Sequence, residues 1–112
     1  MSEENPSVCF VEGFRFKTRL EALENNMNVF RHLQETLLTP QQIEIRKDME
    51  QMIRKQIQEL TKVKYASPEL EQNITWNARM VEHNYNEALT NPRNWRKVDE
   101  YLTYLEVVIE GW

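Results

Sequence analysis

Glycine is almost absent from this chain: Gly13 and Gly111 are the only two among 112 residues. An all-β sandwich or barrel needs many tight turns, and such turns draw heavily on glycine. The sequence therefore argues against an all-β fold. The same scarcity leaves no glycine-rich loop of the kind that cradles phosphate groups.

Cysteine and histidine are also scarce. Cys9 is the only cysteine, which excludes an intramolecular disulfide and favours a reducing, cytoplasmic location. His32 and His83 are the only histidines, and the sequence has neither a Glu-x-x-His motif nor a Cys/His cluster with zinc spacing. No Ser/His/Asp arrangement can be argued from spacing either. We therefore expect no metal site, no cofactor and no enzymatic activity.

Long apolar runs are missing as well. None approaches the ~20 residues that span a bilayer, and the polar, acidic residues 1–6 do not resemble a signal peptide. The net charge is −4, and residues 65–112 contribute all of it, with eight acidic and four basic side chains. Such a surface does not attract nucleic acid non-specifically. We expect no membrane contact, and nucleic acid is the less favoured partner.

Three dipeptides predict where helices begin: Thr39-Pro40, Ser67-Pro68 and Asn91-Pro92. Threonine, serine and asparagine cap the free N–H groups of a first helical turn, and proline suits the first helical position. An apolar pattern of helical period follows each dipeptide, and a similar pattern precedes the first. The sequence therefore predicts four helices, over about 18–38, 40–64, 68–89 and 92–112.

The apolar stripes of these helices predict the core. The first comprises Leu20, Leu23, Met27, Phe30, Leu33 and Leu37; the second Ile45, Met49, Met52, Ile53, Leu60 and Val63; the third Leu70, Ile74, Val81, Tyr85 and Ala88; the fourth Trp95, Val98, Leu102, Leu105, Ile109 and Trp112. Gln34 and Gln56 lie where a helix seam would favour an apolar side chain. Buried amides there could fix the register of an oligomeric seam, and a position at the rim of the core is equally consistent. Since the connections are short, we predict an all-α fold, either an antiparallel four-helix bundle or two helical hairpins.

Residues 8–17 have a different pattern. Phe14 and Phe16 alternate with Arg15 and Lys17, as in a half-buried strand, and Glu12-Gly13 could form a turn. The sequence thus predicts a short extended or β-hairpin-like N-terminal arm. We divide the chain into a polar leader with this aromatic arm, residues 1–17, and one four-helix domain, residues 18–112.

The fourth predicted helix carries a second apolar row, formed by Tyr101, Tyr104 and Val108. A helix that is apolar over more than half its circumference needs contacts on two sides, and tyrosine and tryptophan are enriched at protein interfaces. Either the chain's own core covers both rows, or one row binds a partner. The residues we select for partner binding are Tyr101, Tyr104, Val108 and Trp112, with Phe14 and Phe16 as a second contact.

The second predicted helix supplies an alternative. Lys47, Arg54, Lys55 and Lys62 share a broad face that could follow a phosphate backbone. Acidic residues are interleaved among them, however, which is ordinary for a solvated helix surface. The leading hypothesis is a small helical protein that acts by protein–protein interaction, as an adaptor, regulator or inhibitor. It would bind itself, as a dimer or larger assembly, another protein, or both. A nucleic-acid-associated protein is the alternative.

Overall fold

The computed structural model describes residues 6–64, 66–110 and 112, and this part of the chain is all-α. Helix α1 spans Pro6–Glu35, α2 spans Pro40–Glu59, α3 spans Pro68–Ala88, and α4 spans Trp95–Glu110 after a 3₁₀ turn at Pro92–Asn94. The described residues contain no strand. The all-α prediction and the four helices are confirmed. Residues 1–5 of the predicted polar leader lie outside the described residues.

The three predicted helix starts are real caps. The Thr39 hydroxyl accepts from the Gln42 N–H at 3.3 Å while the Gln42 side chain accepts from the Thr39 N–H at 2.9 Å, which completes a capping box. The Ser67 side chain accepts from the Leu70 N–H at 3.1 Å. The Asn91 side chain caps too, but the turn that it starts is 3₁₀ before α4 begins.

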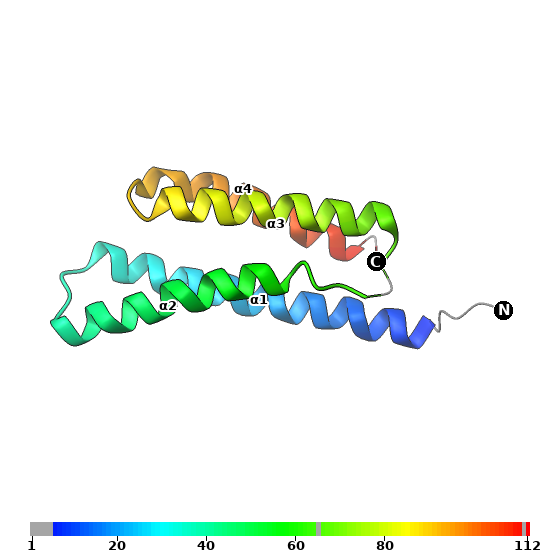
Figure 1. Ribbon diagram of the computed structural model, residues 1–112, viewed down its shortest axis with the longest axis horizontal. Coiled ribbons are helices and arrows are strands. Elements are labelled where there is room, and N and C mark those ends of the chain that lie inside the picture. Colours follow the sequence, from blue (N-terminus) through cyan, green and yellow to red (C-terminus); the bar gives the residue numbers. More distant parts are fainter. Residues whose placement is uncertain (1–5, 65, 111) are drawn as a thin grey trace.

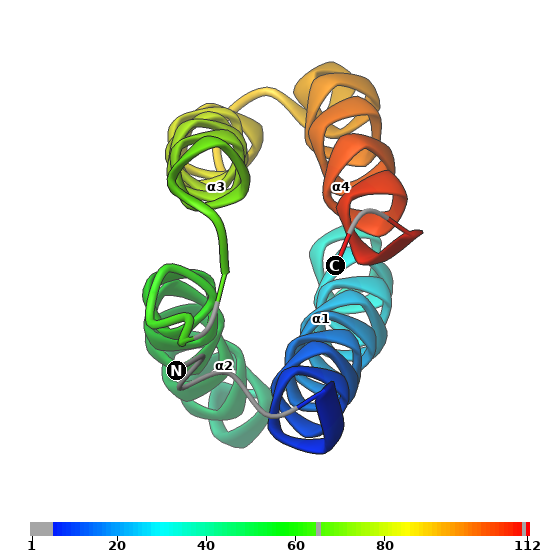
Figure 2. The ribbon, with the colours of Figure 1, turned by 90° about the vertical axis from the view of Figure 1, so that its right-hand side faces the viewer.

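The helices form two hairpins, α1–α2 and α3–α4, stacked as the two layers of an elongated bundle of 59 × 23 × 16 Å (Figure 1). Seen along the bundle, α1 lies beside α2 and α4, and α3 lies beside the same two helices (Figure 2). Each helix is therefore a corner of a square, with α1 diagonal to α3. One side of every helix faces solvent.

The core is built from the predicted stripes. Its buried members include Leu20, Leu23, Met27, Phe30, Ile53, Leu60, Ile74, Val81, Tyr85, Ala88, Trp95, Val98, Leu102 and Leu105. Tyr85 packs against Phe30 and Trp95, with ring centroids 5.8 Å away in both pairs. Burial raises the pKa of the Tyr85 phenol, and its hydroxyl donates to the Glu50 carbonyl at 3.3 Å.

Amide side chains join the helices to one another. The Gln34 carbonyl oxygen accepts from Trp95 Nε1 at 2.8 Å, and its amide donates to the Ala88 carbonyl at 3.1 Å. Asn26 donates to Gln56 at 2.9 Å, which links α1 to α2. Gln34 and Gln56 therefore form hydrogen bonds between helices of the same chain.

The N-terminal segment differs from its prediction, because helix α1 begins at Pro6 and continues through residue 18 without a break. Phe16 is buried and extends the stripe of Leu20 and Leu23 at helical spacing. The alternation at residues 14–17 spans too few positions to outweigh this longer helical period. Buried Gly13 forms no turn: a Cβ there would lie 3.0 Å from the Trp112 ring, so glycine lets the indole approach the helix closely.

Some expected stripe members lie outside the core. Leu37 is fully exposed, because α1 ends at Glu35, and Ile45 and Met52 on α2 are about half exposed. Ile57, which the sequence stripe omitted, is buried instead. The inner face of α2 follows residues 49, 53, 57 and 60, and the helix ends at Glu59, earlier than predicted.

Candidate functional site

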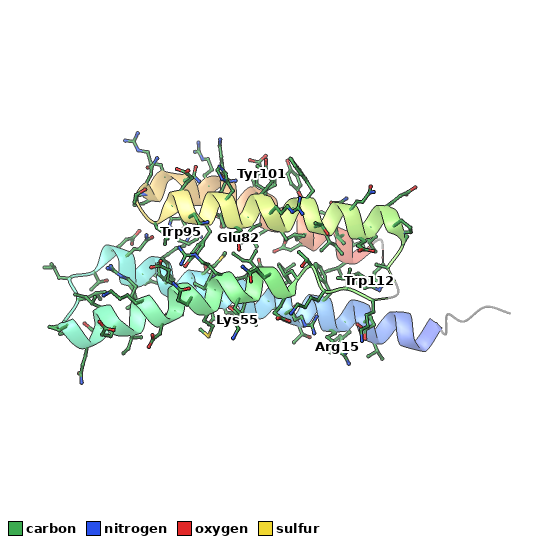
Figure 3. All side chains as sticks on the ribbon, in the orientation of Figure 1. Arg15, Lys55, Glu82, Trp95, Tyr101 and Trp112 are labelled. Carbon is green, nitrogen blue, oxygen red and sulfur yellow. The ribbon has the colours of Figure 1, made fainter. Side chains whose placement is uncertain are left out.

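The six residues predicted to bind a partner divide between core and surface. Phe16 and Val108 are 2% and 5% exposed, so the bundle itself covers them and their selection as contacts is corrected. Trp112 is partly buried and stacks on Phe16 with ring centroids 5.6 Å apart. These three side chains close one end of the bundle (Trp112, Figure 3). Tyr101 is partly buried, whereas Tyr104 and Phe14 are 46% and 61% exposed.

Tyr101 and Tyr104 form an edge-to-face pair on α4, with ring centroids 5.7 Å apart. The Tyr104 hydroxyl donates to the Glu100 carboxylate at 3.0 Å. This hydrogen bond and the charge of Glu100 raise the pKa of Tyr104. The pair therefore presents apolar ring surface with a polar rim, a combination favoured where proteins meet.

The side of α4 that carries this pair is fixed by its neighbours. Asp99 receives a hydrogen bond from Arg31 of α1 at 2.8 Å, which marks the edge facing α1. Tyr101 follows Asp99 by two residues, about 200° around the helix. It consequently lies toward α3, and Figure 3 places Tyr101 on the edge of the α3–α4 layer remote from α1 and α2.

Trp76 of α3 adds a third aromatic ring, and it is 60% exposed. It lies about 200° around the helix from buried Ile74, on the outward side of α3. The Asn94 side chain donates to the Asn84 carbonyl at 2.8 Å and so sets the register of the antiparallel hairpin. Trp76 precedes Asn84 by eight residues, and residue 102 follows Asn94 by eight. Because the two helices are antiparallel, Trp76 lies at about the level of residue 102, between the two tyrosines. We call Trp76, Tyr101 and Tyr104 the outer aromatic surface.

Trp76 is not among the residues predicted from the sequence, although its position in the helical pattern is informative. Trp76 lies off the stripe that contains Ile74 and Val81, on the opposite side of its helix. A tryptophan outside a core stripe must either face solvent or bind something. The prediction used only the aromatic residues of α4 and therefore did not include Trp76.

The basic row predicted on the second helix is largely paired with acids of α2, and Lys62 lies beyond the end of that helix. Lys47 lies 3.6 Å from Glu44, Arg54 lies 3.2 Å from Glu50, and Lys62 lies 2.9 Å from Glu59. Arg54 also donates to Asn86 at 3.1 Å, while Lys55 is exposed. Exposed ion pairs of this kind add little stability, but they cancel charge along the face. Nothing in this arrangement favours a phosphate backbone over solvent.

An acidic pair lies between α1 and α4. Burial, a hydrogen bond to Glu106 and the charge of Glu106 raise the pKa of Glu24 to about 8. Together with Lys17, Glu21 and Glu110, these carboxyls line a cavity of about 340 Å³. Within residues 6–64, 66–110 and 112, no three His, Cys, Asp or Glu side chains gather as metal ligands.

No protein-family model, curated protein or solved structure matches this chain. Among the described residues, no helix is both long enough and apolar enough to cross a membrane.

Proposed function

We propose that this protein acts by binding another protein through the outer aromatic surface, as a small helical adaptor, regulator or inhibitor. The observation that carries the proposal is the exposure of Trp76, whose side chain is 60% exposed on the helix next to the Tyr101–Tyr104 pair, at a level set by the hairpin register. Tryptophan and tyrosine dominate the binding energy of protein interfaces because each buries a large ring and offers one hydrogen-bonding group. A single exposed apolar residue is common, whereas rings from two adjacent helices make a patch.

The partner that fits this surface has an apolar pocket for the Trp76 ring, bordered by groups that hydrogen-bond the tyrosine hydroxyls. Glu100 accepts a hydrogen bond from the Tyr104 hydroxyl and so supplies a polar group at the border of the surface. The nucleic-acid alternative has weaker support, because acids of α2 pair with Lys47, Arg54 and Lys62.

Photo-crosslinking in the native host tests this proposal. A photoreactive phenylalanine analogue at position 104 is expected to give one discrete adduct with a second protein. The same analogue at Ile45 is the matched control, because Ile45 is 54% exposed but lies on α2 in the other layer. Adducts of equal yield at both positions, or none at position 104, would refute the proposal.

The protein that crosslinks at position 104 should be lost from a pull-down when Trp76→Lys is combined with Tyr104→Lys. Both side chains are largely exposed, so the thermal midpoint should change little. A variant that stays folded and retains its partner contradicts the assignment of the surface.

A further inference from the structure

Two basic side chains border the outer aromatic surface on the side of the α3–α4 turn. Arg79 follows Trp76 by three residues on α3, and Lys97 precedes Tyr101 by four residues on α4. Residues three or four apart are neighbours on one face of a helix, so each cation lies next to one ring. Both lie on the side nearer the turn, because α3 runs toward it and α4 runs away from it (Figure 1).

Two further basic residues continue this border toward the turn. Arg93 lies in the 3₁₀ turn, and Arg96 follows Trp95 in the first turn of α4. We call Arg79, Arg93, Arg96 and Lys97 the cationic border; they are the four lysine and arginine residues of segment 65–112, and all are exposed. None of the four forms an ion pair with an acid of the described residues. Their charge is therefore available to a partner.

Many acids of the same two helices point toward the other hairpin. Asp99 accepts a hydrogen bond from a side chain of α1, and Glu82 accepts one from a side chain of α2. Glu106 and Glu110 line the cavity between α4 and α1. Four of the eight acids of residues 65–112 thus face the α1–α2 hairpin. The negative net charge of this segment does not describe the face that carries the outer aromatic surface.

The opposite border of the outer aromatic surface is uncharged. Asn73 precedes Trp76 by three residues, and Val107 follows Tyr104 by three. Val107 is 58% exposed and extends the apolar area away from the turn. The surface therefore combines three rings and an apolar neighbour with cations on one side only.

We infer that the partner presents an acidic segment to the outer aromatic surface, with apolar side chains against the rings and carboxylates against the cationic border. The inference rests on the proposed function and adds the chemistry of the partner. Complementary charge at the border of an interface speeds association and selects among partners. A carboxylate can also bind an arginine through two parallel hydrogen bonds, which makes such a contact directional.

An acidic protein segment fits this surface better than a nucleic acid does. Glu100 lies within the surface, because its carboxylate accepts from the Tyr104 hydroxyl at 3.0 Å. A phosphate backbone has a charge at every nucleotide and would place some of it near Glu100. A protein segment can place a neutral side chain there and restrict its carboxylates to the cationic border.

Charge reversal tests the inference in the chain that carries the photoreactive analogue at position 104. Arg79→Glu with Lys97→Glu should lower the yield of the adduct on the order of tenfold in lysate of the native host. Raising the salt from about 50 mM to about 500 mM should lower the yield for the parent chain in the same direction. Arg79→Gln with Lys97→Gln removes the charges without adding acids and should have a smaller effect. Circular dichroism verifies that each variant is folded.

The matched control is Lys47→Glu with Lys55→Glu, which changes the net charge equally on exposed positions of α2. Its adduct yield should match that of the parent chain. Mass spectrometry of the adduct gives a second, direct measurement. The partner peptide attached at position 104 should contain several aspartate or glutamate residues close to the attachment point.

The outcomes separate this inference from the proposed function. An adduct of equal yield in the charge-reversed chain and in the control, or a neutral or basic attached peptide, would overturn the acidic partner and leave the proposed function standing. Absence of any adduct in the parent chain would overturn both. An adduct with a second copy of this chain would overturn the assignment to a separate acidic protein. Binding of short single-stranded DNA that the same charge reversal weakens would assign the cationic border to phosphate and also overturn the inference.

Discussion

The two ends of the bundle differ in whether the tryptophan that closes the core has a hydrogen-bond acceptor. At one end, which we call the Trp95 end, the indole N–H of Trp95 donates to Gln34, and Arg31 lies over the indole ring at 4.4 Å from its centroid. At the other, the Trp112 end, the indole N–H is buried and has no acceptor within the described chain. Both ends use a tryptophan to close the core, but only the Trp95 end satisfies its polar group.

The charged side chains between α1 and α4 also differ along the bundle. At the Trp95 end Arg31 forms an ion pair with Asp99 at 2.8 Å, so opposite charges join α1 to α4. Midway along the same two helices Glu24 lies against Glu106, and burial together with this neighbouring carboxyl raises the pKa of Glu24 to about 8. A buried unsatisfied donor costs free energy. The Trp112 end should therefore be the less stable of the two, and the following predictions test that difference.

The largest expected effect is the loss of the Trp95 ring. Trp95→Ala should lower the free energy of unfolding by about 3–5 kcal/mol, because it leaves a cavity beside Phe30 and Tyr85. Urea unfolding followed by circular dichroism measures this loss. Tyr104→Ala is the control, since its ring is 46% exposed and should cost less than about 1 kcal/mol. Equal losses in both variants would mean that the aromatic cluster does not anchor the Trp95 end.

The acidic pair should make stability depend on pH. The pKa of Glu24 is about 8 in the folded chain, against 4.5 for the ordinary carboxyl. Its contribution is thus fully present below pH 4.5 and is lost as the pH rises through about 8. Because Glu24 is only partly buried, we discount the shift for solvent screening and expect a loss on the order of 1–2 kcal/mol.

Urea midpoints at pH 5, 7 and 9 measure this dependence. Glu24→Gln should remove most of the decline and should stabilise the chain at pH 9. Glu44→Gln is the control, because Glu44 is exposed on α2 and remote from the pair. A decline that is unchanged in Glu24→Gln would assign the pH dependence to other groups.

The helix starts were predictable because their cause is local. Thr39 and Ser67 each cap a first turn within three residues, so a single sequence contains the whole interaction. The N-terminal half of α1 was not predictable in the same way. Phe16 in this half stacks on Trp112, a contact across almost the entire chain that no local pattern contains. Local alternation at residues 14–17 therefore gave the wrong structure.

The candidate site was only partly predictable for a related reason. The sequence located two apolar rows on α4, but which row is covered depends on which helices flank it. With α1 and α3 as neighbours, Val108 becomes core while Tyr104 stays exposed. Trp76 belongs to the surface only because α3 packs beside α4, and no spacing along one helix contains that information.

The smallest expected effect comes from replacing the tryptophan at the Trp112 end, and it is measured against the same change at the Trp95 end. Trp112→Phe keeps a ring against Phe16 and removes the unpaired N–H, so these gains and losses should cancel to within about 0.5 kcal/mol. Trp95→Phe, the matched change at the other end, leaves Gln34 without its donor and should cost about 1–3 kcal/mol. Thermal or urea unfolding of the two variants side by side gives the difference. If Trp112→Phe costs as much as Trp95→Phe, the Trp112 N–H has an acceptor, and the two ends are equally well satisfied.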